Sequence, residues 1–170
     1  MLQHPLGSPR HWARDFALVG AASSLLTPLM ASMGYMPVGY LALSCLGGGL
    51  FGALTGWLSA KLLAGSLVKV PFFALLLCGP LVGFAWGAST GLFSSMGLPS
   101  TGMLRWSEMW FVSVLAAGFA GALQFAWFWL PYTLRKSRGK SSAFLVGFAI
   151  LMPIFAFTSV AIVSCFVPLV

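Results

Sequence analysis

Apolar residues in this chain occur in five long runs that are separated by short, more polar stretches. A run of about 18 or more apolar residues is typical of a membrane-spanning helix, because a helix of that length covers a hydrocarbon core of about 30 Å. The runs lie at about residues 16–34, 38–58, 70–93, 108–130 and 143–167. The sequence therefore predicts an all-α, polytopic membrane protein with five transmembrane helices.

The scarcity of charge supports this class. Only 6% of the residues are charged, whereas soluble domains carry about 25%. We expect one transmembrane domain at residues 16–170, preceded by a cytoplasmic N-terminal arm at 1–15. The first run is longer than the apolar part of a secretory signal and lacks a clear cleavage site, so it is predicted to be a retained helix.

The distribution of basic residues predicts the orientation. Eight of the nine flank the runs on one side: Arg10, Arg14, Lys61, Lys69, Arg135, Lys136, Arg138 and Lys140; Arg105 lies on the other. Cytoplasmic loops carry an excess of Lys and Arg, so we expect the N-terminus inside and the C-terminus outside. The basic residues behind the net charge of +7 are then expected to set the topology and to contact anionic lipid headgroups, rather than to bind nucleic acid. The patch at 135–140 could also bind an acidic partner.

Rows of glycines at a spacing of four mark the second and third runs. Four residues turn a helix by about 400°, so each row forms a stripe on one face where another backbone can approach closely. The expected packing interface comprises Gly48, Gly52, Gly56, Gly79, Gly83, Gly87, Gly91, Ala117 and Gly121. We predict a glycine zipper in which the two rows pack together or each packs against a different helix. The alternative is that the glycine rows line a passage through the helices.

Few polar side chains lie inside the runs. Gln124 is predicted to hydrogen-bond another helix, and with Thr55, Ser89 and Thr90 it forms the alternative candidate pathway. Pro28 predicts a kink in the first helix. Nearby hydroxyl side chains can donate to the carbonyls that the proline leaves without a helical partner. The indole N–H of Trp86 is expected to find an acceptor on a neighbouring helix.

Catalytic chemistry has little support. Asp15 and Glu108, the two carboxylates, are expected at opposite membrane faces, which rules out an acid–base pair. His11 and Asp15 are four residues apart but lack the further ligands of a metal site, and the three cysteines are interpreted as small packing residues. We predict no enzyme activity, metal or cofactor, although a bound lipid fits the composition.

Three functions follow from these patterns. The first is a structural or accessory subunit that packs with other subunits, identical or different, of a complex in the bilayer. The second is a small homo-oligomeric channel or transporter for an uncharged solute. The third is an assembly factor that recruits an acidic partner through residues 135–140. A bacterial inner membrane is the expected location, with an organelle membrane as the alternative.

Overall fold

The computed structural model describes residues 8–31, 34–63, 72–97 and 114–125, together with positions 128, 151, 154, 158, 161 and 162. Over these residues the protein is all-α, and it has four helices. They are α1 (Pro9–Ala31), α2 (Val38–Leu63), α3 (Phe72–Ser95) and an unlabelled helix at Val114–Phe125. The run expected at 143–167 lies mostly outside the described residues.

One helix in the described part of the chain is long and apolar enough to cross a membrane. It is the 24-residue stretch Val38–Lys61 within α2. Val114–Phe125 is apolar but shorter. The all-α class is therefore shown, whereas the five-span arrangement remains a proposal.

Helix α1 begins at Pro9, earlier than residue 16, where the first run begins. Proline suits the first helical position because its φ is already fixed near the helical value and its missing N–H would have no helical partner. The carbonyl of Ser8 accepts hydrogen bonds from the backbone N–H groups of His11 (3.0 Å) and Trp12 (3.4 Å). Part of the expected N-terminal arm is therefore the first part of α1, and Trp12 within it is buried.

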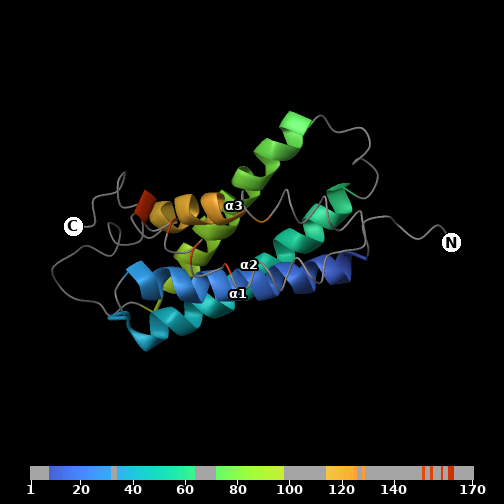
Figure 1. Cartoon of the computed structure of the whole chain (residues 1–170). Helices are drawn as coiled ribbons and strands as arrows, with labels where there is room; N and C mark the ends of the chain where they lie inside the picture. Colours follow the sequence, from blue (N-terminus) through green and yellow to red (C-terminus); the bar gives the residue numbers. More distant parts are fainter. Residues whose placement is uncertain are drawn as a thin grey trace.

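A tight turn places α1 and α2 side by side (Figure 1). Gly34 has a φ of 91°, a left-handed conformation that glycine adopts without steric cost. Its N–H donates to the carbonyl of Leu29 at 3.0 Å, which satisfies one of the free carbonyls at the end of α1. Because the connection is short, the two helices run antiparallel, with Gly48 of α2 near Gly20 of α1 and Gly56 near Trp12.

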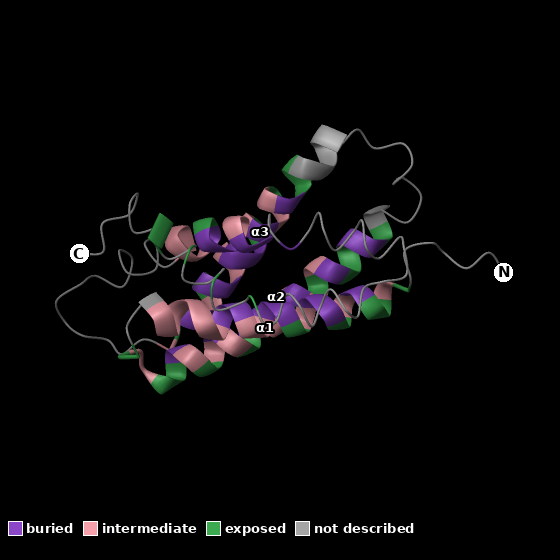
Figure 2. Ribbon diagram, viewed as in Figure 1, coloured by how far each residue is buried: buried purple, intermediate pink, exposed green. Residues whose placement is uncertain are grey.

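An aromatic cluster joins the helices in the interior, where Figure 2 shows buried residues in purple on the facing sides of the ribbons. Phe16 of α1 contacts Phe125 and Phe128, with ring centroids 5.5 and 5.1 Å apart. Trp86 of α3 lies 4.8 Å from Phe125. These rings hold α1, α3 and the 114–125 helix around one core.

Candidate functional site

The glycine row of α2 lies against the backbone of α1. A Cβ atom added at Gly52 would lie 2.5 Å from the carbonyl oxygen of Phe16, and one at Gly56 would lie 2.6 Å from that of Trp12. Gly48 faces Gly20 and Ser24, which are themselves small. Since real Cβ atoms do not approach so closely, these glycines allow the two backbones to touch.

The row of α3 meets a different helix. A Cβ at Gly83 would lie 2.5 Å from the Cβ of Phe125, and one at Gly87 would lie 3.1 Å from the Cα of Gly121 and would also meet the carbonyl of Ala117. Gly79 and Gly91 are buried as well. Of the two arrangements that the sequence allowed, the structure has each row against its own neighbouring helix, α1 or the 114–125 helix.

Large side chains make the contact between α2 and α3. The indole N–H of Trp86 donates a hydrogen bond of 3.1 Å to the carbonyl of Gly48, which confirms the interhelical acceptor expected for this buried tryptophan. Phe93 packs on Gly47 and lies edge-on to Phe51, with ring centroids 6.2 Å apart. Trp86 therefore connects the α1–α2 pair to α3.

Pro28 leaves one carbonyl of α1 without its helical donor, and a side chain of α2 donates to that carbonyl instead. Proline has no N–H, so it cannot donate to the carbonyl of Ser24 four residues earlier. The hydroxyl of Ser44 in α2 donates to this carbonyl at 2.5 Å. The hydroxyl of Thr27 donates to the carbonyl of Ser23 at 2.7 Å. The carbonyl freed by Pro28 was predictable from the sequence, but the role of Ser44 was not.

Gln124 bonds across helices. Its Nε2 donates to the hydroxyl of Thr27 at 2.6 Å, so it connects the 114–125 helix to α1 next to Pro28. The other three pathway candidates bond within their own helices: Thr55 donates to the carbonyl of Gly52, Ser89 to that of Ala85 and Thr90 to that of Trp86.

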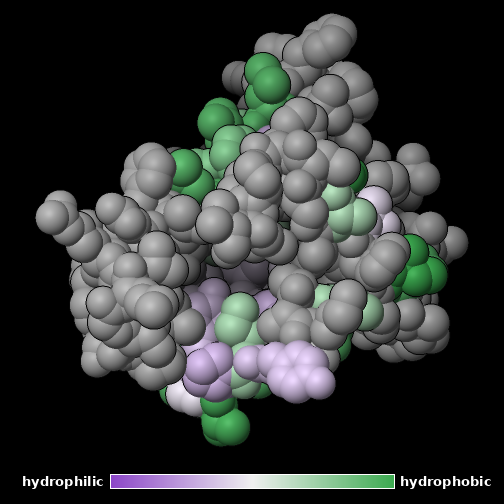
Figure 3. All heavy atoms as spheres, turned by 90° about the vertical axis from the view of Figure 1, so that its left-hand side faces the viewer, coloured by the Kyte–Doolittle hydropathy of each residue, from purple (hydrophilic) through white to green (hydrophobic). Residues whose placement is uncertain are grey.

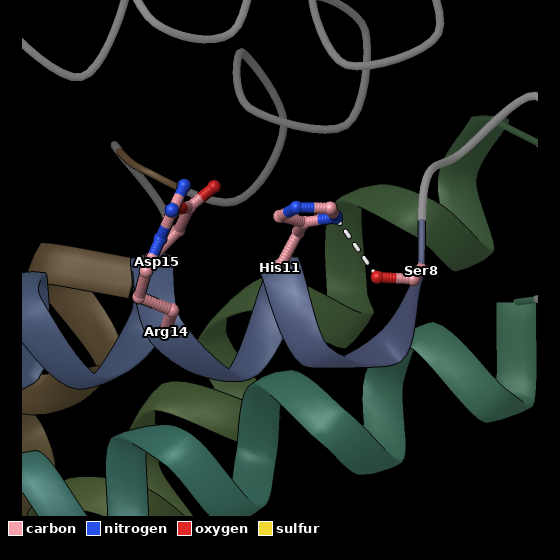
Figure 4. A network of polar contacts seen from close by, with 4 residues as sticks. All are labelled: Ser8, His11, Arg14 and Asp15. Carbon is pink, nitrogen blue, oxygen red and sulfur yellow. Dashed lines mark hydrogen bonds and ion pairs between the residues drawn. The ribbon is translucent and has the colours of Figure 1, made fainter.

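A second group of polar contacts lies at the start of α1 (Figure 4). The carboxylate of Asp15 is buried, with a side-chain exposure of 2%, and accepts a hydrogen bond of 3.2 Å from the guanidinium of Arg14, whose side chain is 66% exposed. His11 Nδ1 lies 2.8 Å from the hydroxyl of Ser8. No group of three or more His, Cys, Asp or Glu residues that could hold a metal ion occurs within the described part of the chain.

Several residues that the sequence singled out lie outside the described part of the chain. The basic patch of Arg135, Lys136, Arg138 and Lys140 lies outside the described residues, and so do Glu108 and Cys165. Cys45 and Cys78 are free cysteines.

An exposed apolar ridge on α2 was not singled out from the sequence. Leu46, Leu50 and Leu54 are 58%, 63% and 50% exposed. They are offset by two residues from the glycine row, which places them about 200° around the helix on the opposite face. Leu77 and Leu81 stand in the same relation to the row of α3, with exposures of 63% and 70%. Figure 2 shows exposed residues in green on the outer side of these helices, and in Figure 3 apolar residues in green reach the displayed surface.

Comparisons with known proteins offer no assignment. No protein-family model matches the chain, and neither a curated protein nor a solved structure matches it. Its function is therefore inferred from its own residues and contacts.

Proposed function

We propose that this protein is a non-catalytic integral membrane subunit that packs within a larger membrane protein complex. The observation that carries the proposal is the division of its helices into two kinds of face. Glycine rows are occupied by neighbouring backbones inside the molecule. The opposite faces present large apolar side chains outward, which water disfavours and which lipid or another apolar subunit accepts.

The proposed topology keeps five spans, with the N-terminus in the cytoplasm and the C-terminus outside. The described helices support its first part, because Gly56 of α2 contacts Trp12 of α1. The antiparallel packing thus brings Lys61, near the end of α2, to the same end of the pair as Arg10 and Arg14. Basic residues at one end are typical of the cytoplasmic side.

The polar contacts favour packing over a solute pathway. A hydrated path needs side chains with free hydrogen-bonding groups along it. Gln124 instead donates to Thr27, and the hydroxyl groups of Ser89 and Thr90 each donate to a backbone carbonyl in α3. Such bonds hold helices together and stabilise their backbones.

The exposed faces favour a role within an assembly. Besides α2 and α3, the 114–125 helix presents Phe119 at 50% exposure, packed edge-on to Phe84 with ring centroids 5.6 Å apart. In a bundle of five helices, few helices are surrounded on all sides by others. Partner subunits, identical or different, would cover part of this surface, and lipid would cover the rest.

The test is extraction of the tagged full chain from a bacterial inner membrane in native lipid, followed by mass measurement of the particle. We expect the chain to resist release by alkaline carbonate and to co-purify with other membrane subunits at a fixed stoichiometry. Release by carbonate would contradict membrane integration. A pure homo-oligomer that conducts an uncharged solute in liposomes would favour the channel instead.

A further inference from the structure

We propose that the outer ridge of α2 is a docking face for an anionic phospholipid of the cytoplasmic leaflet. Its acyl chains would lie along Leu50 and Leu54, and its headgroup phosphate would lie at Lys61 beside Trp57. This inference rests on the proposed function, because it requires α2 to stand in a bilayer.

The apolar part of the ridge continues directly into a basic, aromatic end. Starting from Leu46, steps of four, four, three and four residues lead through Leu50, Leu54 and Trp57 to Lys61. At 100° per residue these five positions fall within about 80° of one face of the helix. All five side chains are exposed, so this face is open along its length.

Lys61 and Trp57 form a headgroup-level pair. The Nζ atom of Lys61 lies 4.0 Å from the centroid of the Trp57 ring. Tryptophan is enriched at membrane interfaces, and lysine near a helix end extends its ammonium group toward the headgroups. The pair offers an indole that suits the interface and a cation that attracts a phosphate.

Charge complementarity selects an anionic lipid rather than a neutral one. In the antiparallel pair, Lys61 lies five residues beyond Gly56, which contacts Trp12, and this is roughly 7.5 Å further along the axis. That height corresponds to the start of α1, where Arg10 is also exposed. Each Lys or Arg near the surface contributes about 1 kcal/mol of attraction to anionic lipid.

The part of the ridge from Leu50 to Lys61 has the length of a lipid chain. From Leu50 to Lys61 the helix rises roughly 16 Å, about half of a hydrocarbon core of about 30 Å. An acyl chain whose headgroup lies at Lys61 therefore reaches Leu50 near the bilayer centre. The rise along the helix from Lys61 to Leu50 therefore matches the hydrocarbon depth of one leaflet.

The experiment places the full chain in nanodiscs with equal amounts of phosphatidylglycerol and phosphatidylcholine, and native mass spectrometry measures the ratio of the two lipids that stay bound. We expect phosphatidylglycerol to predominate, and the ratio to fall about five-fold in Lys61→Gln. Lys61→Arg should keep the ratio, because it keeps the charge.

A ratio near one in the unmodified protein would overturn the proposal, as would equal ratios for Lys61→Gln and Lys61→Arg. A second measurement needs no variant of Lys61: the preference should weaken as salt rises, and a salt-independent ratio would also overturn it. Crosslinking of Leu50→Cys to a co-purifying protein would show that a subunit, not lipid, covers the ridge. Release of the chain by alkaline carbonate would instead refute the proposed function itself.

Discussion

Ser44 of α2 donates a hydrogen bond of 2.5 Å to the carbonyl of Ser24, the group in α1 that Pro28 deprives of its helical donor. The proline and the serine lie on different helices, and the hydroxyl of Ser44 supplies the donor that Pro28 lacks. In an apolar interior an unsatisfied carbonyl is costly, because water is not available to replace the missing donor. The contact therefore makes the part of α1 around Pro28 dependent on α2.

Ser44→Ala should lower the free energy of unfolding by about 1–3 kcal/mol, because it leaves the Ser24 carbonyl buried and unpaired. In a Pro28→Ala background the same change should cost less, since residue 28 can then donate to Ser24 itself. Helicity followed during denaturation in lipid bicelles measures both effects. Equal costs of Ser44→Ala in the two backgrounds would contradict this account.

Gly52→Ala should destabilise the pairing of α1 with α2 by about 1–3 kcal/mol, because its Cβ would lie 2.5 Å from the carbonyl oxygen of Phe16. Gly49→Ala is the matched control. A Cβ at Gly49 would lie 3.7 Å from the Cβ of Ala21, an ordinary contact, so this variant should gain about 0.5–1 kcal/mol from the better helix former. Thermal unfolding of the two variants compares them directly, and an opposite order would refute the close backbone contact.

Trp86→Phe should loosen α3 from the α1–α2 pair. It keeps an aromatic ring near Phe125 but removes the N–H that bonds the carbonyl of Gly48, a loss of about 1 kcal/mol for the hydrogen bond alone. Trp57→Phe, at an exposed tryptophan of α2, should leave stability nearly unchanged. The temperature of half-unfolding in detergent distinguishes the two, and similar values would argue against the bridging role of Trp86.

Gln124→Leu and Thr27→Val should each destabilise the protein, and the double variant should cost less than the sum. Interhelical hydrogen bonds in membranes are coupled by about 0.6 kcal/mol on average, up to about 1.7 kcal/mol. A double-mutant cycle of unfolding free energies measures this coupling. If the single variants instead keep their stability and alter uptake of a neutral solute into liposomes, Gln124 belongs to a pathway.

Much of the fold follows from local patterns. The apolar runs predicted helices near α1, α2 and α3, with ends within seven residues of those observed. An apolar run indicates that a helix is present, but it does not determine where the helix begins and ends. The glycine spacing predicted close-packed faces, but it carried no information on the partner. That choice depends on complementary small residues on another helix, such as Gly20 opposite Gly48.

Contacts between distant residues account for what the sequence left out. The first apolar run begins at residue 16, whereas α1 begins at Pro9 and Trp12 and Asp15 are buried there by packing. The bond from Ser44 to Ser24 joins residues 20 positions apart, and that from Gln124 to Thr27 joins residues 97 apart. Neither pairing has a local signal, although a proline in a buried helix indicates that some donor is required.

The short turn after Gly34 has a consequence for the order of assembly. By the time Leu63 has been synthesised, both backbones of the contact between α1 and α2 exist, as does Ser44, which donates to the carbonyl that Pro28 leaves free. This hairpin can therefore form during translation, before α3 emerges, and present the Gly48 carbonyl as a ready acceptor for the tryptophan that follows.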